Sequence, residues 1–78
     1  MPRIYMRGHR APGLRRLRQQ AEVSQGELAK RAGVGIATIG RIETGRKAND
    51  ATLEKLAGTL SQLLKETVTT TQLTQPSN

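Results

Sequence analysis

The sequence contains no cysteine, tryptophan or phenylalanine, and Tyr5 is its only aromatic residue. Without cysteine the chain forms no disulfide, no thiolate nucleophile and no cysteine metal site. Its single histidine, His9, cannot assemble a histidine metal cluster. No apolar run approaches the roughly 18 residues of a membrane span, and the N-terminus lacks the apolar stretch of a secretory signal. We therefore expect a cytoplasmic protein with no metal and no cofactor, and its short form suits a bacterial or phage gene.

Acidic residues are also scarce, with six Asp and Glu against thirteen Lys and Arg, which gives a formal net charge of +7. They are scattered along the chain, so no paired carboxylate site suits acid–base catalysis, and we expect no enzymatic activity. The positive excess is concentrated, because residues 1–18 hold six arginines and no acid. Such a segment is an electrostatic footprint for phosphate groups. By itself, such a segment is equally consistent with a nucleic-acid partner and with a tail that only keeps the protein in solution.

The length of 78 residues allows one domain at most, and a core this small gains stability from a partner subunit. We predict a basic arm over residues 1–11, a helical domain over 12–66 and a Thr/Gln-rich tail over 67–78. The arm has no helical period, and the composition of the tail permits disorder. For the tail we favour a frayed end, with strand pairing in a dimer as the alternative.

A helix-turn-helix pattern occupies the middle of the chain. Ser24 and Glu27 stand three residues apart and predict a capping box, in which each side chain bonds the other's backbone N–H. Gly33 ends this first helix in the left-handed conformation that glycine favours. A second short helix begins at about Ile36 and stops at Gly45. Two helices of about two turns around a short glycine turn are typical of a unit whose second helix enters the DNA major groove.

Two further helices flank this unit. Apolar residues recur at helical spacing over residues 12–21. Another helix begins at Asn49 or Asp50, either of which is a good N-cap. It turns four apolar residues inward, namely Leu53, Leu56, Ala57 and Leu60. Residues 61–66 either continue it or form a short fifth helix. The predicted fold class is therefore all-α, a compact bundle of four to five short helices.

These fragments, in their order and spacing, resemble the lambda repressor and Cro family of helix-turn-helix DNA-binding domains. The matching residues are Leu17-Arg18, Ser24-Gln25-Gly26-Glu27-Leu28-Ala29, Gly33-Val34, Ile39, Ile42-Glu43-Thr44-Gly45 and Leu53-Glu54-Lys55-Leu56-Ala57. The resemblance implies dimeric binding to palindromic operators and an ion pair between Arg18 and Glu43. It also implies that Gln25 bonds a phosphate and braces the second helix of the motif. Two glycines depart from the pattern: Gly35 is a weak cap, and Gly40 inside the helix costs about 0.5–1 kcal/mol relative to alanine.

The side chains predicted to contact DNA fall into two groups. The base-reading group on the second helix of the motif is Ile36, Ala37, Thr38 and Arg41. The fork of Arg41 suits guanine O6 and N7, whereas Ile36 and Ala37 suit a thymine methyl. A core position for Ile36 and a phosphate clamp for Arg41 remain the alternatives. The predicted phosphate contacts are Gln25, Thr44, Arg46, Lys47, Arg15 and Arg16, and the arm adds Arg3, Arg7 and Arg10. His9 receives no role.

We expect a sequence-specific DNA-binding transcriptional regulator, a repressor that binds double-stranded DNA as a homodimer. The C-terminal half contains more apolar side chains than a four-helix core of this length can bury, and an exposed apolar patch usually marks an interface. We therefore predict that the dimer interface is formed by Leu60, Leu63, Leu64 and Val68. One alternative is an antitoxin, which binds DNA with this domain and a toxin with its tail. Another is a helix-turn-helix scaffold used for protein interaction.

Overall fold

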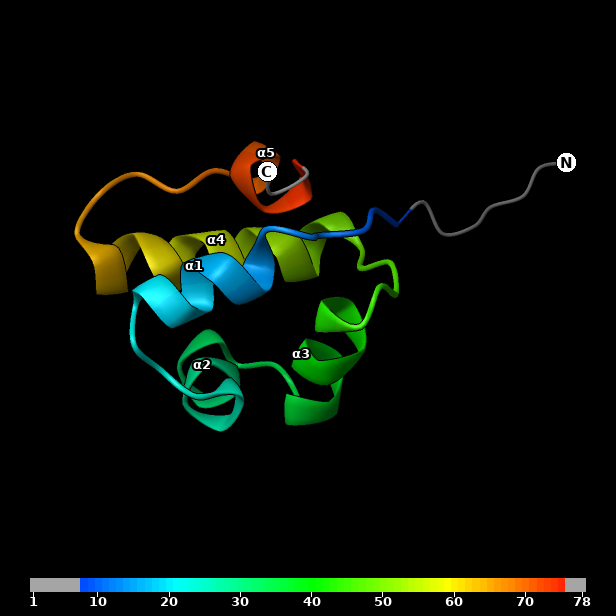
Figure 1. The fold of residues 1–78 in the computed structure, drawn as a ribbon, viewed down its shortest axis with the longest axis horizontal. Coiled ribbons are helices and arrows are strands. Elements are labelled where there is room, and N and C mark those ends of the chain that lie inside the picture. The colour runs from blue at the N-terminus through cyan, green and yellow to red at the C-terminus, as the bar shows by residue number, and fades with distance from the viewer. Residues whose placement is uncertain (1–7, 76–78) are drawn as a thin grey trace, which may run out of the picture.

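A computed structural model describes residues 8–75 of the chain, and this part is a bundle of five helices. They are α1 (Leu14–Gln20), α2 (Gln25–Ala32), α3 (Ile36–Glu43), α4 (Asp50–Leu64) and α5 (Thr70–Thr74). Helix α5 packs on one side of the α1–α4 pair, and α2 and α3 lie on the other side (Figure 1). The predicted all-α fold is therefore confirmed. Within residues 8–75, no helix has both the length and the apolar character needed to cross a membrane.

The helix-turn-helix unit begins at a side-chain cap and turns at a glycine. Ser24 Oγ accepts a hydrogen bond of 3.0 Å from the backbone N–H of Glu27, and Gly33 takes the left-handed conformation with φ of 73°. The reciprocal half of the predicted capping box is absent, because the Glu27 carboxylate accepts instead from Arg31 Nε at 2.6 Å. Arg31 lies one turn further along the same helix and offers a charge, which the Ser24 backbone N–H does not. At the start of α3, Gly35 contributes no side-chain cap.

Helix α4 is the long central element of the core. Asn49 caps it, with Oδ1 accepting from the backbone N–H of Thr52 at 2.9 Å. The helix continues without a break to Leu64 and ends at Lys65, which is left-handed with φ of 57°. Its inward residues are the four that were predicted, and all are buried: Leu53, Leu56, Ala57 and Leu60. Residues 61–64 thus continue this helix, which was one of the two alternatives.

The predicted frayed tail is wrong over residues 67–75, because this segment folds back onto the core. Leu73 is fully buried and Val68 is 5% exposed. Thr69 and Gln72 form a complete capping box at the start of α5. The Ser61 hydroxyl on α4 accepts from the backbone N–H of Val68 at 2.8 Å, which fixes the chain before α5. The domain therefore extends beyond its predicted end at residue 66.

The docking of α5 also overturns the predicted dimer patch. Leu60 is fully buried and Val68 nearly so within the chain itself, while Leu63 and Leu64 are half-buried and packed against the same core. The prediction counted these side chains against a four-helix core and omitted the segment after α4, which folds back onto that core. They therefore form no exposed apolar patch. Among the described residues, the one large hydrophobic side chain at the surface is Ile36.

The predicted arm is shorter than residues 1–11. His9 pairs with Ala48 in an isolated antiparallel bridge, and Ala11 is buried in the core. Residues 8–11 are therefore part of the domain, and helix α1 begins at Leu14 rather than at residue 12. Two arginines that were predicted to contact phosphates from the arm, Arg3 and Arg7, lie outside the described residues.

Candidate nucleic-acid interface

The orientation of α3 is fixed by its inward face. Ile39 is fully buried and Ile42 is 3% exposed, and the helix packs against both α2 and α1. Because these two isoleucines are three positions apart, they lie on the same face of the helix, and the opposite face points outward. Ile36 is 56% exposed, and Ala37 and Arg41 are also exposed. The structure thus places Ile36 at the surface rather than in the core.

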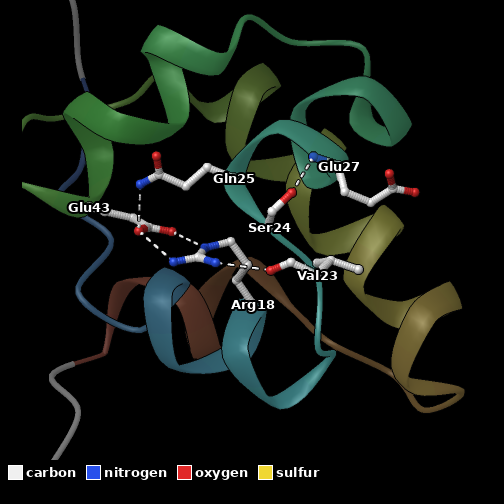
Figure 2. A network of polar contacts seen from close by, with 6 residues as sticks. All are labelled: Arg18, Val23, Ser24, Gln25, Glu27 and Glu43. Atoms are coloured by element: carbon white, nitrogen blue, oxygen red, sulfur yellow. Dashed lines mark hydrogen bonds and ion pairs between the residues drawn. The ribbon is translucent and has the colours of Figure 1, made fainter.

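A network of polar contacts holds the end of α3 against α1 and the start of α2 (Figure 2). The predicted pair is brought together: Arg18 Nε donates to Glu43 Oε2 at 2.6 Å, and Arg18 Nη2 donates to Glu43 Oε1 at 3.1 Å. Gln25 Nε2 donates to Glu43 Oε1 at 2.9 Å. Arg18 Nη1 also donates to the carbonyl of Val23 at 2.9 Å. One carboxylate on α3 therefore ties together three segments of the chain, and the Gln25 amide braces α3 directly.

The burial of this network explains its electrostatics. The side chains of Arg18 and Glu43 are 13% and 4% exposed. Burial acts to raise the pKa of Glu43, but hydrogen bonds from Arg18 and Gln25 and the charges of Arg18 and Arg15 outweigh it, so the pKa lies below its ordinary value. The hydrogen bond to Glu43 raises the pKa of Arg18 against the opposing effect of burial. Both groups therefore stay charged at neutral pH.

Replacing Arg18 with alanine is expected to destabilise the fold by about 2–3 kcal/mol, because it leaves the Glu43 carboxylate buried with Gln25 as its remaining side-chain donor. The matched control is Arg31→Ala, which breaks the exposed pair with Glu27 and should cost less than about 1 kcal/mol. Urea denaturation at pH 7 measures both. Equal losses for the two variants would show that the network contributes no more than a surface ion pair.

The lowered pKa of Glu43 also predicts a pH dependence. A carboxylate with a depressed folded-state pKa contributes full stability above its ordinary pKa of about 4.3 and loses it as the pH falls through the folded value. The wild type should therefore lose more stability between about pH 5 and pH 3 than Glu43→Gln, which has no charge to lose at this position. Urea midpoints across this range provide the comparison. Parallel curves for the two proteins would contradict the assignment.

A groove with a volume of about 650 Å³ runs between α3, the following loop and the segment before α1. Its lining residues are Gly8, Arg10, Thr38, Arg41, Ile42, Gly45, Arg46, Lys47, Ala48, Asn49 and Thr52. Four of them are cationic and none is acidic. Arg10 is held in place, because its Nε donates to the carbonyl of Gly45 at 3.1 Å. We call this feature the cationic groove; its chemistry suits an extended polyanion.

Most of the predicted DNA contacts gather at or beside the cationic groove. Thr38, Arg41, Arg46 and Lys47 line it. Thr44 and Arg15 line an adjacent hollow of about 400 Å³ between α1 and the end of α3. Arg16 is exposed and lines neither hollow, and Gln25 lies in the network with Glu43.

Arg10 was predicted only as part of a basic arm, yet it lines both hollows. Its position depends on a bridge between residues 39 positions apart, His9 and Ala48. No local signal in the sequence pairs these two residues. The charge of Arg10 could therefore be recognised from the sequence, but its position between the two hollows could not.

The order of the helices and the glycine turn between α2 and α3 define a helix-turn-helix domain. A family model described as a helix-turn-helix domain matches residues 13–65, which is more than half of the chain. The chain therefore belongs to the helix-turn-helix domain family, and its architecture and membership point to DNA binding. Searches among curated proteins and among solved structures give no match.

Proposed function

We propose that the protein is a sequence-specific transcriptional regulator of the lambda repressor and Cro type, which represses by binding a palindromic operator as a homodimer. One observation carries this proposal: α3 is anchored by its inward face and by Glu43, and it presents an exposed face beside the cationic groove. A helix that is held by its buried face and exposes the opposite face beside a cationic surface suits the major groove and its flanking phosphates. The cytoplasm of a bacterium, or of a phage-infected cell, is the compartment that suits this activity.

Base reading is assigned to four residues of α3, namely Ile36, Ala37, Thr38 and Arg41. Arg41 has the planar fork that binds guanine O6 and N7 together. Ile36 leaves apolar surface in water in the free protein, and contact with a thymine methyl would cover it. Thr38 lines the cationic groove and offers a hydroxyl to a base or a phosphate. This combination of one fork and two apolar side chains favours a half-site containing both guanine and thymine.

Phosphate contacts are assigned to the residues around this helix, namely Gln25, Thr44, Arg46, Lys47, Arg15, Arg16 and the arginines Arg3, Arg7 and Arg10. Arg46 and Lys47 follow α3 and line the cationic groove. For Gln25, the amide N–H faces Glu43, so its side-chain oxygen and the N-terminus of α2 are the groups left for a phosphate. These contacts fix the position of α3 on the duplex and carry little sequence information.

A homodimer is proposed because one short helix reads too few bases for a specific site. Two copies related by a two-fold axis would place their α3 helices about 34 Å apart, one turn of DNA. Leu60 and Val68 are buried within the chain, so the dimer contact cannot use them. The antitoxin alternative needs a free tail for its toxin, and the part of that tail described by the structure is docked on the core as α5.

Selection of bound fragments from random duplex DNA tests the proposed function. We expect enrichment of an inverted repeat whose half-sites are centred about 10 base pairs apart, with guanine and thymine in each half-site. Enrichment of a single, unrepeated site would overturn the homodimer and leave sequence-specific binding. Absence of any enriched sequence would overturn the regulator itself.

A further inference from the structure

The segment before α1 is built onto the loop that follows α3 (Figure 1). We call residues 8–11 the strap. His9 and Ala48 exchange two backbone hydrogen bonds, with N···O distances of 2.8 Å and 2.9 Å. Ala11 is 1% exposed and holds the other end of the strap in the core. The strap is therefore attached at both ends, with Arg10 between the two attachments.

Gly8 sets how closely the strap approaches the loop. A Cβ atom at this position would lie 2.9 Å from the Cβ of Lys47 and 3.1 Å from the carbonyl oxygen of Ala48. Neither neighbour is the free end of a flexible side chain, so any larger residue must push the strap and the loop apart. Glycine at position 8 thus allows the pairing of His9 with Ala48, and this pairing fixes where Arg10 begins.

Arg10 is oriented as well as placed. Its Nε–H donates to the carbonyl of Gly45 at 3.1 Å. The N–H groups at the end of its guanidinium are then left to donate to a group that enters the groove. Arg41, Arg46 and Lys47 line the same groove, and no acidic residue does. The nearby carboxylate of Asp50 lies 3.5 Å from His9 Nε2. A group that enters the groove therefore meets four cations drawn from the strap, α3 and the loop.

We propose that the strap and the loop after α3 form a preformed site for the phosphodiester backbone of DNA, in which Arg10 contacts a phosphate and Gly8 positions it. This inference rests on the proposed function. It adds that the strap and the loop contact the backbone of the DNA strand that borders the major groove entered by α3. Sites for small molecules are mostly apolar clefts, whereas this one is an open groove lined by four cations and much larger than a single phosphate group. Repeated phosphates along a strand match that shape and charge better than a free phosphate does.

Arg10→Gln in the full chain tests the contact by the salt dependence of duplex binding. Each neutralised phosphate contributes about 0.9 to the log–log salt slope, so this variant should flatten the slope by about 0.9 per subunit, and Arg10→Lys should restore most of it. The matched control is Lys65→Gln, which removes a charge just beyond the far end of α4 and should leave the slope nearly unchanged. Fluorescence anisotropy with a labelled duplex at several salt concentrations provides the measurement.

Gly8→Ala tests the positioning without changing any charge. It should weaken duplex binding severalfold and flatten the slope in the same direction as Arg10→Gln, while circular dichroism shows an unchanged fold. Its control is Gly58→Ala on α4, where an added Cβ meets no atom within 4 Å apart from the local backbone of its own helix, and binding should not change.

The outcomes separate the two proposals. If the wild type binds duplex and both Arg10→Gln and Gly8→Ala match it, the phosphate site is overturned and the proposed function stands. If the wild type binds no duplex, both are overturned. Titration with inorganic phosphate, followed by NMR at the amides of residues 8–10 and 45–48, distinguishes the ligand source. Saturation at submillimolar phosphate would assign the groove to a free anion instead of DNA.

Discussion

Arg41→Ala is expected to weaken binding to the selected operator by about 1–3 kcal/mol per half-site, and therefore by about twice that for a dimer, while binding to random DNA changes little. Arg41 is exposed on α3, whose orientation is fixed by the buried Ile39 and Ile42. A guanidinium that bonds two acceptors of one guanine loses both bonds on substitution, and no other side chain on that face has the same fork.

The control for this prediction is Arg16→Ala, which removes an exposed charge from α1 that lines neither hollow. It should weaken operator and random DNA to a similar, small extent. Because Arg41 also lines the cationic groove, a second role is open to it, and the experiment decides between the two. Equal losses on both kinds of DNA would make Arg41 a phosphate contact and leave base reading to Ile36, Ala37 and Thr38.

Leu73→Ala is expected to destabilise the protein by about 2–5 kcal/mol, the usual range for a leucine truncated to alanine in a packed core. Leu73 is fully buried although it lies near the end of the chain. Helix α5 packs on α1 and α4, and the backbone N–H of Gly13 donates to the carbonyl of Leu73 at 2.9 Å. The side chain therefore closes the core on the side opposite the helix-turn-helix unit.

Thr71→Ala is the matched control, since Thr71 lies on the same short helix and is exposed. It should change the free energy of unfolding by less than about 0.5 kcal/mol. Thermal and urea denaturation of the two variants give the comparison. If Leu73→Ala proves as mild as Thr71→Ala, then α5 contributes nothing to the stability of the domain and the predicted frayed tail is the better description.

The elements that could be predicted from the sequence are those with local signals. Ser24 and Gly33 mark the ends of α2 through short-range bonding and backbone conformation, although the Glu27 side chain does not complete the predicted capping box. Asn49 likewise marks the start of α4. Burial along α4 followed from the spacing of its leucines, because a helix in a small bundle turns one face inward. The motif and the outward face of α3 could therefore be predicted from residue types and their spacing.

The features that were missed depend on contacts between distant segments. The strap exists because His9 meets Ala48, and neither residue carries a signal for the other. Helix α5 did have a local signal, since Thr69 and Gln72 match the spacing of a capping box. The Thr- and Gln-rich composition of this segment also permits disorder, and the prediction gave more weight to the composition than to the capping box. The burial of Leu73 depends on its packing against α1 and α4, which no local sequence pattern indicates. The predicted dimer patch was wrong for the same reason, because the prediction did not include the segment that folds back onto the core after α4.

This domain is proposed to bind DNA and to discriminate between sequences through α3. The most direct test is an equilibrium competition, in which a labelled operator obtained by selection is displaced by unlabelled operator or by a scrambled duplex of the same length and composition. At about 0.15 M salt, we expect the scrambled duplex to compete at least about 10³-fold less well, and affinity for both duplexes to fall as salt rises. Equal competition by the two duplexes, or an affinity insensitive to salt, would contradict the account.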